Sequence, residues 1–265
     1  MTAGNSFLMS KAAEIRRDVV RMIGLARSGW LSASLSIVDI LVWLYWEEMS
    51  VNPSSPWLET RDRFVLGRGE GAPALYATLA GKGFYERDEL WSYRRLGAML
   101  QGYPLALRIP GVDAPGGGSR GMGLGIANGL ALSLRGRRVS SSVFCLTGED
   151  DAREGVFWEA AASSPRFGLD NLVLLFETRG GSPSTGDKLR SFGWRTEECD
   201  GHDFASIGAA FKALSRAEGP LCIFARTVLG KGVSFLEGDP CAERKVPDRE
   251  RVDMALSELN GEGVL

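Results

Sequence analysis

Two nearly uninterrupted apolar segments constrain the fold of this chain more than any other feature of its sequence. Val139–Leu146 and Leu172–Glu177 carry side chains suited to burial on both faces of a sheet, as strands of a helix-covered parallel sheet are. Segments with helical periodicity separate them from three further expected strands, Arg63–Leu66, Phe192–Asp200 and Leu221–Val228. The alternation predicts an α/β fold with a doubly wound, mostly parallel sheet.

Several helices are expected from the periodicity of apolar residues or from a signal at the start of the helix. An amphipathic helix is expected over 11–28, a further helix over 87–96, and an apolar helix over Leu124–Leu134. Ser36-Ile-Val-Asp39 resembles a capping box that opens a helix running to about Glu48. Residues 249–260 are expected to form a C-terminal helix that either packs on a neighbour or frays.

Acidic and glycine residues follow two of the expected strands. Gly148-Glu149-Asp150-Asp151 comes after the first, and Arg179-Gly-Gly181 follows the second. Ligands of open parallel sheets bind at the carboxyl ends of the strands. The glycine-rich stretch 116–123 can also cradle an anion with its backbone N–H groups. The pattern predicts a phosphate site, with a carboxylate-held cation as one option; helix caps and a sharp turn are the alternatives.

Composition narrows the chemistry available to such a site. The chain has one histidine, His202, and its four cysteines form no C-x-x-C motif, which excludes an imidazole cluster and argues against zinc or dithiol chemistry. The formal net charge of −2 gives no general attraction to nucleic acid or to anionic membranes. No segment resembles a membrane span or a signal peptide, so we expect a cytoplasmic protein.

The order of the motifs resembles the transketolase family. The matching segments include Ile15-Arg-Arg-Asp18, Arg61-Asp-Arg-Phe-Val-Leu66, Gln101-Gly102, Glu154-Gly155 and Gly230-Lys-Gly-Val-Ser-Phe235. The resemblance implies a domain over residues 1–236 that binds the diphosphate of thiamine diphosphate with Mg²⁺, followed by a peripheral tail at 237–265 with a short helix. The activity it implies is the transfer of a two-carbon ketol unit between sugar phosphates.

The resemblance also implies a partner chain. In the family, a second domain holds the aminopyrimidine and supplies an activating glutamate, and the motifs of that domain are not found in this sequence. We therefore expect the N-terminal subunit of a split transketolase, whose partner is a separate C-terminal subunit. The expected assembly is a homodimer or a heterotetramer with sites at the interface, and neither nucleic acid nor a membrane is an expected partner.

Four positions depart from the family where it has histidines that face thiamine or the sugar. They carry Trp30, Glu70, Tyr103 and Arg226 here. Tyr103 and Glu70 retain groups that hydrogen-bond a substrate, whereas Trp30 and Arg226 replace imidazole poorly as substrate-facing residues. Because a general acid or base typically contributes about 10²–10⁴-fold to a rate, we expect ordinary ketol transfer to be slow or absent. His202, in an Asp-Gly-His-Asp turn, is expected to be structural.

The expected metal site departs as well. Glu149 stands where the family has aspartate, Asp150 where it has glycine, and Arg179 where it has asparagine. Glu149 can still reach a cation, but a guanidinium has no acceptor atom and cannot ligate one. The other cofactor-binding residues that the resemblance implies are Gly118, Ser119, Arg120 and Gly148.

Two arrangements of Arg179 remain open. It either pairs with a diphosphate, assisted by Arg120, without metal, or it forms an internal salt bridge with Glu149 or Asp150 that closes the pocket. Glu154 matches a family glutamate in a proton relay between sites, and equally suits a carboxylate in the first turn of a helix. The two functional hypotheses are an enzyme subunit with altered cofactor anchoring and a catalytically silent scaffold or regulatory homologue.

Overall fold

The described strands form a single parallel sheet. The computed structural model describes residues 3–115, 118–180, 183–214, 218–239 and 246–261. The strand order is β1-β2-β3-β5-β4, and every neighbouring pair is parallel. The strands are β1 (Arg63–Leu66), β2 (Val143–Gly148), β3 (Leu172–Thr178), β4 (Arg195–Asp200) and β5 (Leu221–Arg226). The predicted α/β fold with a parallel sheet is confirmed.

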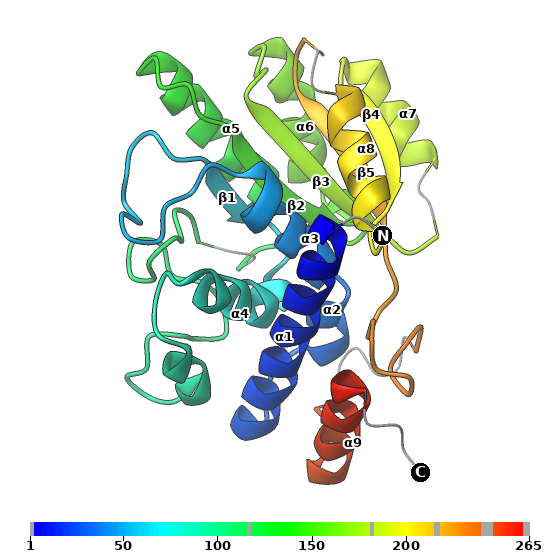
Figure 1. The fold of residues 1–265 in the computed structure, drawn as a ribbon. Coiled ribbons are helices and arrows are strands. Elements are labelled where there is room, and N and C mark those ends of the chain that lie inside the picture. The colour runs from blue at the N-terminus through cyan, green and yellow to red at the C-terminus, as the bar shows by residue number, and fades with distance from the viewer. Residues whose placement is uncertain (1–2, 116–117, 181–182, 215–217, 240–245, 262–265) are drawn as a thin grey trace.

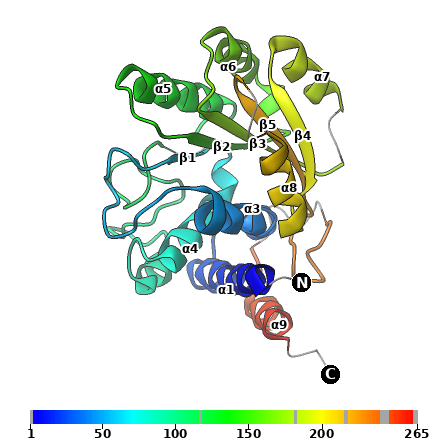
Figure 2. The same ribbon diagram turned by 45° about the horizontal axis from the view of Figure 1, so that its top comes forward.

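Helices cover both faces of this sheet (Figures 1 and 2). One face is covered by α5 (Met122–Gly136), α6 (Gly155–Arg166) and α7 (Pro183–Phe192). The other face carries α2 (Leu31–Leu35), α3 (Val38–Trp43), α4 (Ala72–Lys82) and α8 (Phe204–Leu214), and α1 (Ala3–Ala26) packs on α3 and α4 as an outer layer. The side chains of β3 alternate between the two faces of the sheet. Leu172, Leu174 and Phe176 pack in the hydrophobic core beneath α5, α6 and α7, whereas Val173 and Leu175 pack in the core on the opposite face. Burial on both sides explains why the strand sequence is continuously apolar.

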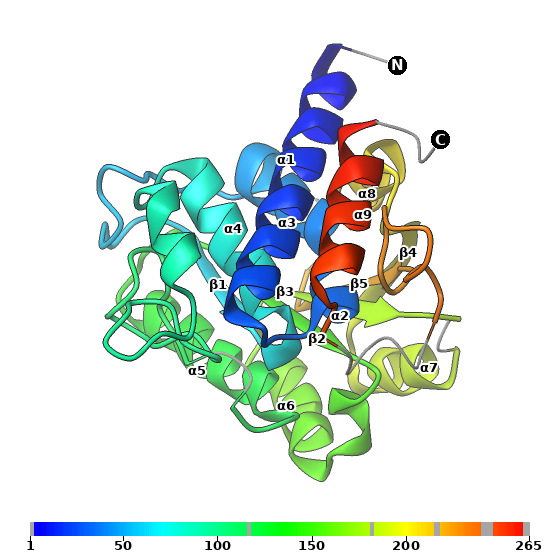
Figure 3. The ribbon, with the colours of Figure 1, turned by 90° about the horizontal axis from the view of Figure 1, so that it is seen from below.

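The C-terminal helix packs on the chain itself. Helix α9 (Arg249–Asn260) lies alongside α1 (Figure 3). A Cβ on Gly24 would come within 2.9 Å of Val252, so the glycine allows the two helices to approach closely. The Arg17 guanidinium donates a hydrogen bond of 3.1 Å to the Leu259 carbonyl near the end of α9. The division of the chain at residues 236 and 237 stays a prediction.

The predicted capping box at Ser36 is wrong. Ser36 ends α2, and the segment after it divides into α3 and a π-helical turn η1 (Leu44–Glu48); Ile37 precedes α3 without a side-chain cap. The Ser36 hydroxyl donates instead to a Glu177 carboxylate oxygen at 2.6 Å, and Asp39 pairs with Arg16. Ser36 and Asp39, which the local pattern assigned to the start of a helix, therefore bind residues from distant segments instead.

Two other elements differ from the sequence expectations. The segment at 87–96, expected as a helix, forms only the short 3₁₀ helix η3 (Arg87–Ser92). Helix α7 was not predicted, because its first turn, Pro183-Ser-Thr-Gly186, has the composition of a loop. Short 3₁₀ turns also follow β1 and β2, as η2 (Gly69–Gly71) and η4 (Asp151–Arg153).

Candidate functional site

A small, highly charged cavity lies at the carboxyl ends of β1, β2 and β3. Its volume is about 50 Å³, which is room for only a few water molecules. Four arginines and five carboxylates line it together with Gly148: Arg68, Arg120, Arg153, Arg179, Glu70, Glu149, Asp150, Asp151 and Glu177. This is the edge of the sheet at which the sequence predicts a phosphate site.

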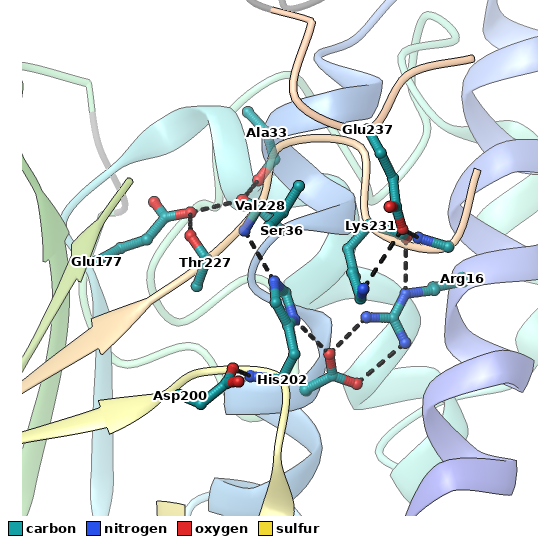
Figure 4. Close-up of polar contacts among 12 residues, drawn as sticks. Arg16, Ala33, Ser36, Glu177, Asp200, His202, Thr227, Val228, Lys231 and Glu237 are labelled. Carbon is teal, nitrogen blue, oxygen red and sulfur yellow. Dashed lines mark hydrogen bonds and ion pairs between the residues drawn. The ribbon is translucent and has the colours of Figure 1, made fainter. Parts of the chain in front are cut away.

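The innermost pair is a buried salt bridge between Arg68 and Glu177. Arg68 follows β1 and Glu177 ends β3, and their side chains are 8% and 3% exposed. One oxygen of Glu177 also accepts hydrogen bonds from the Ser36 hydroxyl at 2.6 Å and the Thr227 hydroxyl at 2.8 Å, as drawn in Figure 4. Glu177 is therefore fully engaged within the protein and joins β3 to β5 and to the turn before α3.

Asp151 binds two backbone N–H groups with its carboxylate. One oxygen accepts from Gly121, which precedes α5, at 2.8 Å, and the other from Gly148, the last residue of β2, at 2.9 Å. Burial raises the pKa of Asp151, while the two N–H donors act in the opposite direction. The first turn of α5 is thus fixed to the end of β2 by a carboxylate of the chain.

Glu149 is held by groups from the end of β3. One of its oxygens accepts a hydrogen bond of 2.6 Å from the Thr178 hydroxyl and one of 3.1 Å from the backbone N–H of Arg179. Arg179 is exposed, and its side chain lines the cavity. The carboxylate that the family resemblance implies as a metal ligand therefore already accepts two hydrogen bonds from the protein.

Arg120 crosses the mouth of the cavity. One guanidinium nitrogen lies 3.1 Å from a Glu70 carboxylate oxygen, and another lies 3.7 Å from Asp150. The second oxygen of Asp150 lies 3.5 Å from Arg153. These contacts join the loop before α5 to the turns that follow β1 and β2. The side chains of Arg120, Glu70 and Asp150 are 49%, 21% and 37% exposed, so the ion pairs lie at the surface.

These residues do not fit a Mg²⁺ ion. Magnesium requires near-octahedral oxygen coordination at about 2.1 Å, and no group of three or more histidine, cysteine, aspartate or glutamate side chains among the described residues is placed to hold a metal. Glu149 accepts two hydrogen bonds from the protein, Asp150 lies between two arginines, and Arg179, whose side chain has no ligand atom, lines the same cavity. A guanidinium beside a cation would add repulsion to the loss of a ligand.

The single histidine belongs to a separate polar network, shown in Figure 4. Its Nδ1 lies 2.7 Å from an Asp39 carboxylate oxygen, and its Nε2 accepts a hydrogen bond of 2.8 Å from the backbone N–H of Val228. Asp39 also pairs with Arg16 at 2.6 and 3.0 Å. Burial raises the pKa of Asp39, but the charge of Arg16 and the hydrogen bonds from His202 and Arg16 lower it more, and the net shift is downward. Both ring nitrogens of His202 are engaged, in agreement with the expected structural role.

Half of the predicted site residues lie together. Those that line the cavity are Glu70, Arg120, Gly148, Glu149, Asp150 and Arg179, whereas Gly118, Ser119, Tyr103, Glu154, Trp30 and Arg226 do not. The rings of Trp30 and Tyr103, two of the residues that we expected in place of family histidines, have centroids 5.9 Å apart. Gly118 and Ser119 are exposed in the loop before α5, and Gly116 and Gly117 lie outside the described residues.

The last two predicted site residues, Glu154 and Arg226, lie at the ends of secondary-structure elements. Glu154 is exposed at the start of α6, where it makes no side-chain capping bond. Arg226 is exposed at the end of β5. The predicted site residues did not include Arg68, Arg153 and Glu177, and Asp151 entered the prediction only as part of the acidic stretch after β2. All four follow or end strands at the predicted edge. That position was the signal that could have identified them.

Thiol chemistry finds no support in the described part of the chain. Cys145, Cys199 and Cys222 are buried free thiols, and burial raises the pKa of Cys199 to about 12, so a reactive thiolate is not expected at neutral pH. Cys241 lies outside the described residues. None of the described helices is long and apolar enough to cross a bilayer.

Sequence comparison identifies relatives over nearly the whole chain. The family model described as "Transketolase, thiamine diphosphate binding domain" matches residues 9–243. The 6-deoxy-6-sulfo-D-fructose transketolase subunit SqwG of Clostridium sp. (strain MSTE9) is 34% identical, with 97% of each chain covered. An apulose-4-phosphate transketolase subunit of Actinobacillus succinogenes is 32% identical, with 96% of each chain covered.

Longer relatives match this chain over less than half of their length. Transketolase-like protein 2 of Homo sapiens is 32% identical, and the match covers 93% of this chain and 41% of that protein. The crystal structure of transketolase from Campylobacter jejuni superposes with a TM-score of 0.89 at 25% identity, covering 96% of this chain and 43% of that one. The chain thus corresponds in length to the proteins named as subunits.

Proposed function

Because the chain belongs to the transketolase family and matches its thiamine diphosphate binding domain, we propose that it works as the N-terminal subunit of a two-chain transketolase. A separate C-terminal subunit would supply the rest of the assembly. Two relatives of nearly equal length are named as transketolase subunits, while the chain spans only 43% of a single-chain transketolase of known structure. The names of these relatives as subunits are the support for a partner.

Within that assembly, the role that the pocket supports best is a catalytically silent one, as a scaffold or regulatory subunit. The observation that carries this proposal is the engagement of Glu149 and Asp150 by protein groups beside Arg179. Thiamine diphosphate supplies a carbanion in this family, and the protein orients it. A pocket that does not fit the metal offers no conventional anchor for the diphosphate.

The surroundings of the pocket support the same role. Trp30 and Tyr103 contact each other, and Glu70 pairs with Arg120, so three of the four positions that lost histidine now contact other protein side chains. General acid–base groups act within hydrogen-bonding reach of the reacting atoms. None of these three side chains supplies an imidazole there, and Arg226 cannot give up its proton at neutral pH.

A second candidate function is ketol transfer with a metal-free anchor. Arg120, Arg153 and Arg179 line the cavity with exposed side chains, and arginine binds phosphate oxygens bidentately. In this arrangement the guanidinium groups would take over the charge of the cation. The candidate retains the activity that the relatives are named for, with a substrate that differs from ordinary sugar phosphates.

Titration of thiamine diphosphate separates the two candidates. The purified chain is titrated by calorimetry and thermal unfolding, with Mg²⁺ or EDTA, alone and with a C-terminal transketolase subunit. Saturation at 100 times the dissociation constant would add about 2.7 kcal/mol to the free energy of unfolding. A stable complex without a thiamine diphosphate response supports the silent role. A response that ignores Mg²⁺ and disappears in Arg179→Ala supports the second candidate, and a Mg²⁺-dependent response with ketol transfer would overturn the first.

A further inference from the structure

Arg120 forms ion pairs with two carboxylates that line the cavity. Arg120 is the residue of the loop before α5 whose side chain reaches both Glu70, after β1, and Asp150, after β2. The nitrogen–oxygen distances are 3.1 and 3.7 Å. A guanidinium in this position is the natural donor for an incoming phosphate, but here it already faces two carboxylates of its own chain.

We propose that Glu70 and Asp150 determine what this pocket accepts, by holding Arg120 across its mouth and repelling diphosphate anions. The inference rests on the proposed function, because it explains why a silent subunit would not bind the diphosphate of the family's cofactor. Glu70 occupies a position where the family has histidine, and Asp150 one where it has glycine. Each substitution therefore places a negative charge where the family has none.

The charges of the pocket support this inference. Arg68 is matched by the buried Glu177, and Asp151 is held by two backbone N–H groups. The groups at the mouth are Arg120, Arg153 and Arg179 against Glu70, Glu149 and Asp150, so their formal charges cancel. A pocket without net positive charge and without a metal has little attraction for an anion.

The ion pairs themselves are weak enough to be exchanged. Arg120 is 49% exposed, and both carboxylates are in contact with solvent; exposed salt bridges of this kind contribute little to stability. Removal of the two carboxylate charges should therefore leave the fold intact and make the guanidinium available. The site that results would take a diphosphate without a divalent cation.

The test is calorimetric titration with inorganic pyrophosphate in EDTA. Glu70→Gln/Asp150→Asn should bind at least about tenfold more tightly than the unmodified chain, the effect of one charge-assisted hydrogen bond. Glu159→Gln/Glu198→Gln makes the same change in net charge at two exposed residues away from the cavity, and it should leave the affinity unchanged. Adding Arg120→Ala to the first variant should remove the gain, and Mg²⁺ should not increase it.

Three results would overturn the inference: equal pyrophosphate binding by the pocket variant and its charge-matched control, retention of the gain without Arg120, or a requirement for Mg²⁺. Thermal unfolding of every variant establishes that a missing response does not come from an unfolded protein. Failure here leaves the proposed function standing, because the pyrophosphate titrations do not test whether the unmodified chain binds thiamine diphosphate. The proposed function fails instead if the unmodified chain binds Mg²⁺–thiamine diphosphate.

Discussion

Gly123 in the first turn of α5 lies directly against Gly67 at the end of β1. A Cβ built on Gly123 would come within 2.4 Å of the Gly67 Cα and within 3.3 Å of its backbone nitrogen. No side-chain rotation relieves that contact, because the opposing atoms belong to the backbone. This pair of glycines therefore allows the start of α5, and with it the loop that carries Arg120, to approach the end of the sheet where the cavity lies.

Gly123→Ala should destabilise the fold. We expect a loss of about 1–3 kcal/mol in the free energy of unfolding, the typical cost of overpacking a well-packed region, measured by urea denaturation. Gly129→Ala is the matched control in the same helix, since a Cβ there meets no atom within 4 Å. That control should gain up to about 1 kcal/mol from improved helix propensity. Equal stabilities of the two variants would contradict the close approach.

Asp39→Asn should cost about 3–5 kcal/mol, because it leaves the buried Arg16 without its counter-charge. Chemical denaturation at pH 7 measures this loss. Asp253→Asn removes a carboxylate that is 70% exposed on α9 and should change stability by less than about 0.5 kcal/mol. A loss at Asp39 no larger than at Asp253 would show that the network with His202 does not stabilise the fold.

The contribution of Asp39 should also depend on pH. Its pKa in the folded protein is lowered, so the stabilisation is fully present above the unfolded-state pKa of about 3.9 and is lost as pH falls through the lower, folded-state value. The difference in unfolding free energy between the unmodified chain and Asp39→Asn should therefore be constant from pH 7 to about 5 and shrink below about 4. A difference that grows in acid would have the wrong sign.

Glu177→Gln should be strongly destabilising. Glutamine can still accept hydrogen bonds from Ser36 and Thr227, but it leaves the charge of Arg68 unmatched beside β3 in a buried site. We expect a loss of about 3 kcal/mol or more in the free energy of unfolding, read from the midpoint of denaturant unfolding. Thr227→Val removes only one hydroxyl donor and should cost about 1 kcal/mol. A smaller loss for the glutamate variant than for the threonine variant would contradict the ion pair.

Restoring the family's residues should create a response to magnesium. The variant Glu149→Asp/Asp150→Gly/Arg179→Asn replaces a guanidinium and two carboxylates with the residues that the family resemblance implies at these positions. Its melting temperature in thiamine diphosphate should rise when Mg²⁺ replaces EDTA, whereas that of the unmodified chain should not change. The control is the unmodified chain, measured with thiamine diphosphate in Mg²⁺ and in EDTA. A clear rise of its melting temperature in Mg²⁺ would show that Arg179 does not prevent metal binding.

The fold could be predicted because its signals are local. Apolar runs such as Leu172–Glu177 identify strands buried on both faces, and the helical periodicity between them determines a parallel sheet. The same reasoning located the cavity at the carboxyl ends of β2 and β3 and identified Glu149, Asp150 and Arg179 as residues of that edge. The prediction failed at Ser36. Its hydroxyl donates to the carboxylate of Glu177, 141 residues away in the sequence, instead of capping a helix.

The sequence by itself determined the family and the architecture, because each of these follows from the order of motifs and of apolar segments along the chain. Only the tertiary structure decided which charges face each other: Arg120 meets Glu70 across 50 residues of chain, and Arg68 meets Glu177 rather than any neighbour. Such pairings depend on the directions in which side chains leave elements that are distant in sequence. The close packing of Gly67 against Gly123 places the start of α5 next to the end of β1. This contact could not be predicted from the local sequence around either glycine.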